Sequence, residues 1–201
     1  MSENNDNNPA PEVKAEANSD SKQSTVKSPG DLARRAEHLC QATLATHAAN
    51  SDSLEVTRPT VTNCPDGGHD IGVTGQTGEV KELVSTLTGQ STNNLEFLDK
   101  SAKNGKLKVR IDVKNGKTIS ADVIDKHAAD SNRSPDCQVN LLVLTNESVK
   151  VTPAAQKKLN EQQKLFKENG TLVDIASPDG LKKVESKNKA IEKTETEKKS
   201  S

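Results

Sequence analysis

The stretch VNLLVLT, residues 139–145, is a nearly continuous run of valine and leucine in a chain that is otherwise strongly polar. Side chains of a strand alternate between the two faces of its sheet, so a strand that is apolar at successive positions has to bury both faces. The run therefore predicts an interior strand that is covered by helices on both sides. This pattern favours the α/β class over a sheet with one face in water.

The sequence after this strand continues with a helix and a further strand. Thr152 and Pro153 suit a helix start, with Thr as the N-cap and Pro at the first helical position, and Gly170 suits the helix end. TLVDI at 171–175 predicts the next strand, and SPDGLKKV at 177–184 predicts a short final helix. Strand, helix and strand in this order predict parallel strands joined by a helical crossover.

The clearest strand before this region is KLKVRIDVK, residues 106–114, in which charged and apolar residues alternate. Its apolar positions predict a face that packs in the core: Leu107, Val109, Ile111 and Val113. Its other face carries Lys108, Arg110, Asp112 and Lys114. Asn115-Gly116 then predicts a turn, and residues 120–129 predict a helix whose inner side includes His127.

The N-terminal half predicts shorter elements. In chain order these are a helix at 31–48 with Asp31 as a candidate N-cap, an edge strand at 55–62 containing Pro59, a strand from Asp70 to Thr74, a helix over 80–87 that stops at Gly89, and a short helix near 95–98. GVTGQTG at 72–78 lacks the Gly-Lys-Ser/Thr of a phosphate-binding loop and predicts a hairpin turn. We therefore predict an α/β fold with a mixed β-sheet flanked by helices.

The two ends of the chain are polar and lack apolar periodicity. Residues 1–30 are rich in Asn, Ser, Pro and charge, which predicts a disordered tail. The segment from about Glu185 is also polar, and its pattern is compatible with either a frayed helix or disorder. The predicted organisation is a disordered tail at 1–30, a folded domain at 31–183 and a polar C-terminal tail at 184–201.

The composition fits one domain with a small core. Of the 201 residues 30% are apolar, and the only aromatic side chains are two phenylalanines, which predicts an aliphatic core. No apolar run approaches the roughly 20 residues that span a bilayer, and the N-terminus lacks a signal-peptide pattern, so we expect no membrane partner. Three widely spaced cysteines (Cys40, Cys64 and Cys137) fit reduced thiols better than a disulfide framework, which predicts a cytoplasmic protein.

Residues 100–117 concentrate positive charge in a chain whose formal net charge is −1. Such a stripe can attract the phosphates of a nucleic acid even when the whole protein is nearly neutral. It is equally compatible with a strand and turn that are exposed to water. Its seven basic residues are Lys100, Lys103, Lys106, Lys108, Arg110, Lys114 and Lys117.

The triplet Asp112-Val113-Lys114 carries the clearest chemical signal. Metal-dependent phosphodiester cleavage requires carboxylate oxygens for the cation and a nearby ammonium group for the phosphate or the attacking water. Residues two apart on a strand point the same way, so Asp112 and Lys114 are expected to enter one cleft. The glycine turn DGGHD at 66–70 brings Asp70 to the start of another strand. Taken alone, an exposed charged strand face is the simpler interpretation of the pair.

Over residues 31–183 the chain resembles the Mrr-type restriction endonuclease domain of the PD-(D/E)xK superfamily. The resemblance rests on LARRAEHLC at 32–40, DGGHDIGV at 66–73, VRIDVKNGKTIS at 109–120 and the stretch from VNLLVLT to SPDGL at 139–181. The order of helices and strands is also similar. The resemblance implies a restriction-endonuclease-like sheet and a metal-dependent DNA endonuclease, which a homodimer would equip with one active site for each DNA strand.

By this resemblance Asp70 and Asp112 bind Mg²⁺ or Mn²⁺, and Lys114 orients and activates water. Glu37, in the first predicted helix, matches the acid that assists the metal site. Among the candidates for DNA contact, His69 has two interpretations, because it could either contact phosphate or metal or fill the turn. The residues proposed to contact DNA are Lys108, Arg110, Lys117 and His69.

Two features depart from the pattern of the family. The family usually has Gln or Glu where this chain has Asp112, which is shorter by one methylene group. The connection from Asp70 to Asp112 is long, with a predicted helical insertion at about 79–105, and a different assignment of that insertion makes Glu79 and Lys81 the alternative pair. The alternative function is a catalytically inactive nuclease-fold protein that binds DNA or another protein. A zinc site at Cys64 would lack paired Cys/His spacing.

Overall fold

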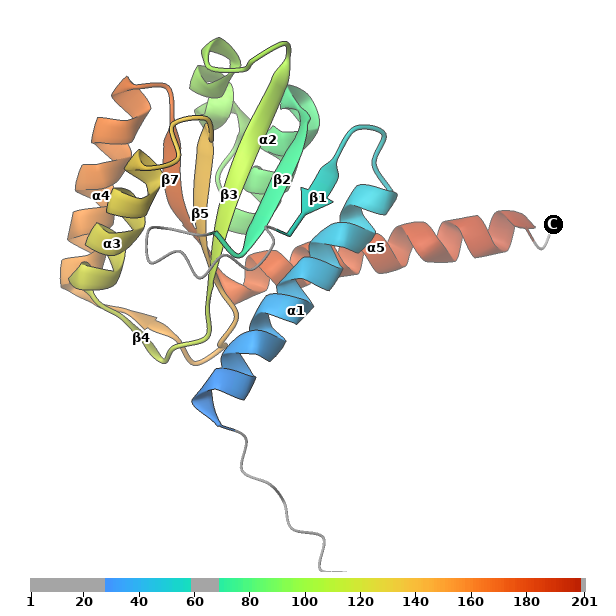
Figure 1. Ribbon diagram of the computed structural model, residues 1–201. Helices are drawn as coiled ribbons and strands as arrows, with labels where there is room; N and C mark the ends of the chain where they lie inside the picture. Colours follow the sequence, from blue (N-terminus) through green and yellow to red (C-terminus); the bar gives the residue numbers. More distant parts are fainter. Residues whose placement is uncertain (1–27, 59–68, 200–201) are drawn as a thin grey trace, which may run out of the picture.

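The computed structural model describes residues 28–58 and 69–199, which form an α/β fold with a mixed β-sheet flanked by helices (Figure 1). The strands are β1 Glu55–Thr57, β2 Ile71–Gln76, β3 Lys106–Lys114, β4 Thr118–Ile119, β5 Val139–Leu144, β6 Lys150–Val151 and β7 Leu172–Ala176. The helices are α1 Pro29–Ala49, α2 Thr77–Thr88, the 3₁₀ helix η1 Thr92–Lys100, α3 Ala121–Asn132, α4 Pro153–Glu168 and α5 Pro178–Lys199.

The main sheet has five strands in the order β1-β2-β3-β5-β7. β3, β5 and β7 run parallel to one another, whereas β1, β2 and β3 pair antiparallel. All six residues of β5 are buried, as its apolar run predicted. The α/β class, the mixed sheet and the parallel second half of the chain are therefore confirmed.

Helices cover the sheet on both faces and form two apolar layers. On one face α1, α2 and α5 pack against the apolar side of β2 and β3. On the other face α3 and α4 pack against β5 and β7, with Leu142 and Phe166 in the shared core. None of the helices within residues 28–58 and 69–199 is long and apolar enough to cross a membrane.

The start of α1 and the segment 72–78 differ from their predictions. Ser28 rather than Asp31 is the N-cap of α1, because its hydroxyl oxygen accepts a hydrogen bond from the Asp31 amide. The segment 72–78 is not a hairpin, since β2 runs directly into α2. Its glycine at position 75 has a packing role instead: a Cβ there would lie 2.5 Å from Leu54 Cδ2 and 3.2 Å from the Ser53 carbonyl oxygen, so the Leu54 side chain and the loop before β1 would have to shift.

The C-terminal segment is part of the folded unit. α5 continues from Pro178 to Lys199, so the boundary predicted at residue 183 falls inside a helix. Val184 and Asn188 are buried, and the side-chain amide of Asn188 donates to the Thr43 carbonyl on α1 at 3.0 Å. These contacts explain why the polar pattern is helical here, and the far end of α5 projects beyond the sheet (Figure 1). Of the tail predicted at residues 1–30, Pro29 and Gly30 belong to α1, and residues 1–27 lie outside the described residues.

Gly180 allows α5 to approach the end of α2. A Cβ at this position would collide with the carbonyl oxygen of Leu87, which belongs to the α2 backbone and cannot rotate away. We expect Gly180→Ala to lower the free energy of unfolding by about 1–3 kcal/mol, measured by urea denaturation. Gly78→Ala in α2 is the control, since a Cβ there meets no atom within 4 Å and the change should be neutral or stabilising. Equal effects of the two substitutions would contradict this role for Gly180.

Candidate active site at the ends of β2 and β3

Asp70 lies directly before β2 and is fixed to β3 by two hydrogen bonds. Its backbone amide donates to the Ile111 carbonyl at 3.0 Å, and its Oδ2 accepts from the Val113 amide at 2.6 Å. The carboxylate therefore extends the antiparallel pairing of β2 with β3 by one residue. Oδ1 has no hydrogen-bond partner among the described residues. The rest of the glycine turn, including Cys64 and Asp66, lies outside the described residues.

Three of the four predicted catalytic residues line one pocket of about 400 Å³. Glu37 enters it from α1, Asp70 from the start of β2, and Lys114 from the last position of β3. The structure therefore brings these three residues to one pocket, and their catalytic roles stay a prediction. The pocket is completed by Pro29, Leu32 and Ala33 of α1 and by residues 113, 115 and 116.

The electrostatic environment of Asp70 disfavours its charge. Burial raises the pKa of Asp70 above its ordinary value, and the nearby charge of Asp112 adds to this effect. The Val113 amide and the positive charges of Lys114 and Arg110 act in the opposite direction but do not cancel the increase. Asp70 is thus a partly buried carboxylate without a directly bound cationic side chain among the described residues.

On α1, Glu37 in the pocket wall is ion-paired and the nearby Cys40 is buried. Glu37 forms an ion pair with Arg58 at 3.7 Å, which holds its carboxylate at the pocket wall. Cys40, one helical turn further along α1, is fully buried, and burial raises the pKa of its thiol to about 12, assisted by the charge of Asp70. A thiol with this pKa remains protonated near neutral pH, so Cys40 does not serve as a nucleophile here.

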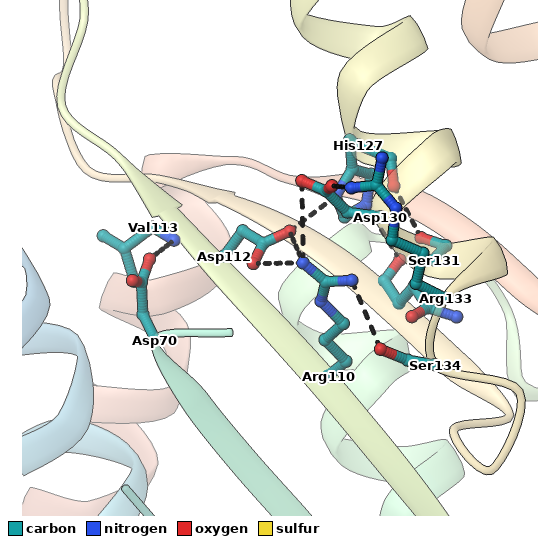
Figure 2. A network of polar contacts seen from close by, with 10 residues as sticks. Asp70, Arg110, Asp112, Val113, His127, Asp130, Ser131, Arg133 and Ser134 are labelled. Atoms are coloured by element: carbon teal, nitrogen blue, oxygen red, sulfur yellow. Dashed lines mark hydrogen bonds and ion pairs between the residues drawn. The ribbon is translucent and has the colours of Figure 1, made fainter. Parts of the chain in front are cut away.

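Asp112 does not line this pocket, which corrects the expectation that Asp112 and Lys114 enter one cleft. Figure 2 shows Asp112 pointing toward Arg110 and α3, whereas Asp70 points toward Val113. Both Asp112 oxygens lie within hydrogen-bond distance of Arg110 Nη2, at 3.1 and 3.2 Å, and Oδ2 also pairs with His127 Nδ1 at 2.9 Å. Burial alone would raise the pKa of Asp112, but His127 and Arg110 outweigh it and hold this pKa below its ordinary value.

Arg110 cannot contact DNA in this arrangement, because its side chain is 0% exposed. This corrects its predicted role. Its guanidinium also lies 3.8 Å from Asp130, which forms an ion pair with Arg133 at 2.8 Å, and 3.4 Å from the Ser134 hydroxyl (Figure 2). The sequence indicated that His127 faces inward, but it gave no signal that α3 supplies partners for the charged face of β3.

The other basic residues of 100–117 lie at opposite ends of β3. Lys108 forms an ion pair with Asp136 at 3.0 Å, which raises the pKa of Lys108, so its ammonium group already has an anionic partner. Lys117 is exposed beside β4 next to Lys150, whose amide donates to the Lys117 carbonyl at 2.9 Å. β3 has nine residues, so its ends are roughly 27 Å apart. The sequence stripe is therefore two separate groups; the first contains Lys100, Lys103 and Lys106, and the second contains Lys114 and Lys117.

His69 and the alternative pair have ordinary structural contacts. The His69 ring lies against Gly72, and burial, followed by the charge of Arg110, lowers the pKa of His69. Glu79 accepts hydrogen bonds from the hydroxyls of Ser51 and Ser53, which lowers the pKa of Glu79. Lys81 forms an ion pair with Asp99 at 2.7 Å. Glu79 and Lys81 thus stabilise the fold and do not line the pocket of Asp70.

Of the two predicted metal ligands, Asp70 is free to bind a divalent cation and Asp112 is not. The described residues contain no group of three or more His, Cys, Asp or Glu placed to hold a metal. Asp70 still fits, because it is a hard oxygen ligand with one oxygen unbound among these residues, and Mg²⁺ keeps several waters while using one or two carboxylates. Asp112 does not fit as arranged, because Arg110 and His127 already bind it. Comparison of the chain with protein-family models, curated proteins and solved structures finds no match, so the chemistry of the site is inferred from its own residues.

Proposed function

We propose that this chain is a metal-dependent DNA endonuclease that hydrolyses phosphodiester bonds, with its active site in the pocket of Asp70. The observation that supports it most directly is the convergence of Asp70, Lys114 and Glu37 on one pocket from three separate elements. The Mrr-type resemblance of the sequence is consistent with the same residues. A cytoplasmic location fits the proposal, because Cys40 and Cys137 carry free thiols.

The residues have distinct tasks in this mechanism. Asp70 would hold Mg²⁺ or Mn²⁺, which when bound polarises the phosphate and lowers the pKa of water. Lys114 is exposed and makes no ion pair with the described residues, so its ammonium group is available to a phosphate oxygen or to the attacking water. Glu37 would orient water from the opposite wall. A homodimer would supply one such pocket for each strand of DNA.

The DNA backbone would be bound by the exposed lysines next to the pocket. Lys117 and Lys150 lie side by side at β4 and β6 and make no ion pair with residues of the described ranges. Contacts of this kind neutralise phosphates without reading the bases, so binding is expected to weaken steeply with salt.

Nicking of a supercoiled plasmid with Mg²⁺ or Mn²⁺ tests the proposal. We expect Lys114→Met to lower the cleavage rate by about 10²–10³-fold, since it removes the charge that faces the phosphate. Lys106→Met is the matched control, because Lys106 is an exposed lysine at the other end of the same strand and should leave the rate unchanged. Equal rates for the two variants, or no metal-dependent cleavage by the wild type, would contradict the proposal.

The second candidate is a nuclease-fold protein that binds DNA without cutting it. It is favoured by the engagement of Asp112 with Arg110 and His127, which leaves one predicted metal ligand unavailable. In that case the wild type binds DNA but does not nick it with either metal. Lys114→Met would then weaken binding for all sequences alike and reduce its salt dependence by about one phosphate contact.

A further inference from the structure

We propose that Arg110 is a resident counter-ion of Asp112, bound where a divalent cation would otherwise bind, so that Asp112 is not a metal ligand in this protein. Asp70 is then the carboxylate that remains available to a cation. This inference concerns the same site as the proposed function, and it rests on that function only for the identity of the cation at Asp70. It does not depend on whether DNA is cut.

The geometry leaves little of the Asp112 carboxylate free. Arg110 Nη2 lies 3.1 Å from Oδ1 and 3.2 Å from Oδ2, so a single nitrogen bridges both oxygens. Oδ2 also has a second partner, because His127 Nδ1 lies 2.9 Å from it. A metal ion that used either oxygen would have to bind beside the Arg110 guanidinium, whose charged hydrogen bonds to both oxygens are stronger than neutral ones.

The burial of Arg110 makes that displacement unfavourable. Its side chain is 0% exposed, and that of Asp112 is 10% exposed. A guanidinium that leaves its carboxylate inside a protein has no water to replace the lost partner, and an unpaired buried charge is strongly destabilising. Arg110 Nε already lacks a hydrogen-bond partner among the described residues, so loss of the Asp112 contacts would leave still more of this buried guanidinium unpaired.

The carboxylates around Asp112 also have cationic partners without a metal. Arg110 and Arg133 supply two positive charges for the two negative charges of Asp112 and Asp130 in one connected set of ion pairs, and His127 is a further partner of Asp112 at 2.9 Å (Figure 2). A divalent cation placed here would add two positive charges beside a fixed guanidinium, and like charges at short range repel strongly in a buried site. Asp70 differs, since its only side-chain hydrogen bond within the described residues comes from the Val113 amide.

Titration of the full chain with Mn²⁺, followed by electron paramagnetic resonance, tests the assignment of the ligand. We expect Asp70→Asn to weaken Mn²⁺ binding by at least about tenfold, which corresponds to roughly 1.4 kcal/mol. Asp112→Asn should leave the affinity of the wild type unchanged, because its carboxylate is already occupied. Equal losses in the two variants would overturn the inference.

Removal of the guanidinium provides the converse test. Arg110→Met should expose Asp112 and raise the affinity for Mn²⁺, or create binding where the wild type has none. The double variant Arg110→Met/Asp112→Asn should return to the wild-type behaviour, which a general loosening of the fold would not produce. If Arg110→Met does not fold, Arg110→Gln takes its place. A folded variant of Arg110 that binds Mn²⁺ no better than the wild type would overturn the inference.

The outcomes separate this inference from the proposed function. Gain of Mn²⁺ binding in the Arg110 variant and its loss in the double variant would support the inference even if the wild type nicks no DNA. Cleavage by the wild type that is abolished equally by Asp70→Asn and Asp112→Asn, with equal loss of Mn²⁺ affinity, would support the endonuclease and overturn the role of Arg110.

Discussion

Arg110→Ala is expected to lower the free energy of unfolding by about 3–5 kcal/mol, several times the effect of a typical substitution. The substitution removes one partner of a buried ion pair and leaves Asp112 with a buried negative charge that, among the described residues, only His127 can compensate. It also removes the side chain that connects β3 to α3 through Asp130. Urea denaturation followed by circular dichroism measures the change.

Two comparisons separate the loss of the charge from other effects. Arg110→Met removes the charge but fills much of the same volume, so it should lose less stability than Arg110→Ala, and the loss that it retains measures the contribution of the charge. Lys106→Ala, at an exposed position of the same strand, should lie within about 0.5 kcal/mol of the wild type. A loss at Arg110→Ala below about 1 kcal/mol would mean that the buried pair contributes no more than a surface ion pair.

The effect of Arg110→Ala should also depend on pH. His127 and Arg110 together hold the pKa of Asp112 below its ordinary value of 3.8, despite the opposing effect of burial. A carboxyl group with a lowered pKa in the folded state stabilises the protein above its unfolded pKa, and this contribution is lost as the pH falls through the folded value. The difference in stability between the wild type and Arg110→Ala should therefore shrink below about pH 3.8.

The sequence predicted β3 and β5 well, because the pattern of apolar residues within each strand indicates which of its faces are buried. The apolar run of β5 indicated a strand covered on both faces, and the alternation in β3 identified its core face, where Leu107 and Val113 are buried. Alternating charge normally indicates a face in water, so the same pattern gave no sign that Arg110 and Asp112 are buried. Their burial depends on Asp130 and His127 in α3, and charge pairing between elements leaves no periodic signal in a sequence.

The candidate site was predictable only in part for the same reason. Asp70 and Lys114 were expected in one site by resemblance to the Mrr-type domain. In the structure the antiparallel pairing of β2 with β3 brings the start of β2 and the end of β3 together. Glu37 was placed by resemblance to the Mrr-type domain, and it lines the same pocket. Asp112 was expected beside Lys114 by strand periodicity, which gives the side of the strand but not the partner that orients a side chain.

Asp70→Asn is expected to abolish metal-dependent cleavage while it stabilises the folded protein. Asparagine can still accept the hydrogen bond from the Val113 amide through its carbonyl oxygen, so the local structure should persist. It cannot supply the negative charge that a divalent cation requires. The cleavage rate should fall on the order of 10³-fold, the effect of losing several kcal/mol of metal-derived stabilisation of the transition state.

The gain in stability follows from the raised pKa of Asp70, which burial causes. In the pH range between the unfolded value of 3.8 and the raised folded value, the folded state binds more protons than the unfolded state, so stability falls as the pH rises through that range. At neutral pH the ionised Asp70 is therefore destabilising, and Asp70→Asn should raise the free energy of unfolding by about 1 kcal/mol. Below about pH 3.8 both proteins are neutral at this position, and the gain should disappear.

Asp136→Asn is the matched control, since Asp136 lies outside the pocket and its pKa is lowered by the hydrogen bond from Lys108. This substitution should neither stabilise the protein nor alter cleavage. If Asp70→Asn loses stability at neutral pH, the carboxylate is held by favourable partners and the pocket is a structural feature of the fold. If Asp70→Asn gains stability and loses cleavage together, the carboxylate of Asp70 serves catalysis at a cost in stability, because an asparagine at this position would give the more stable fold.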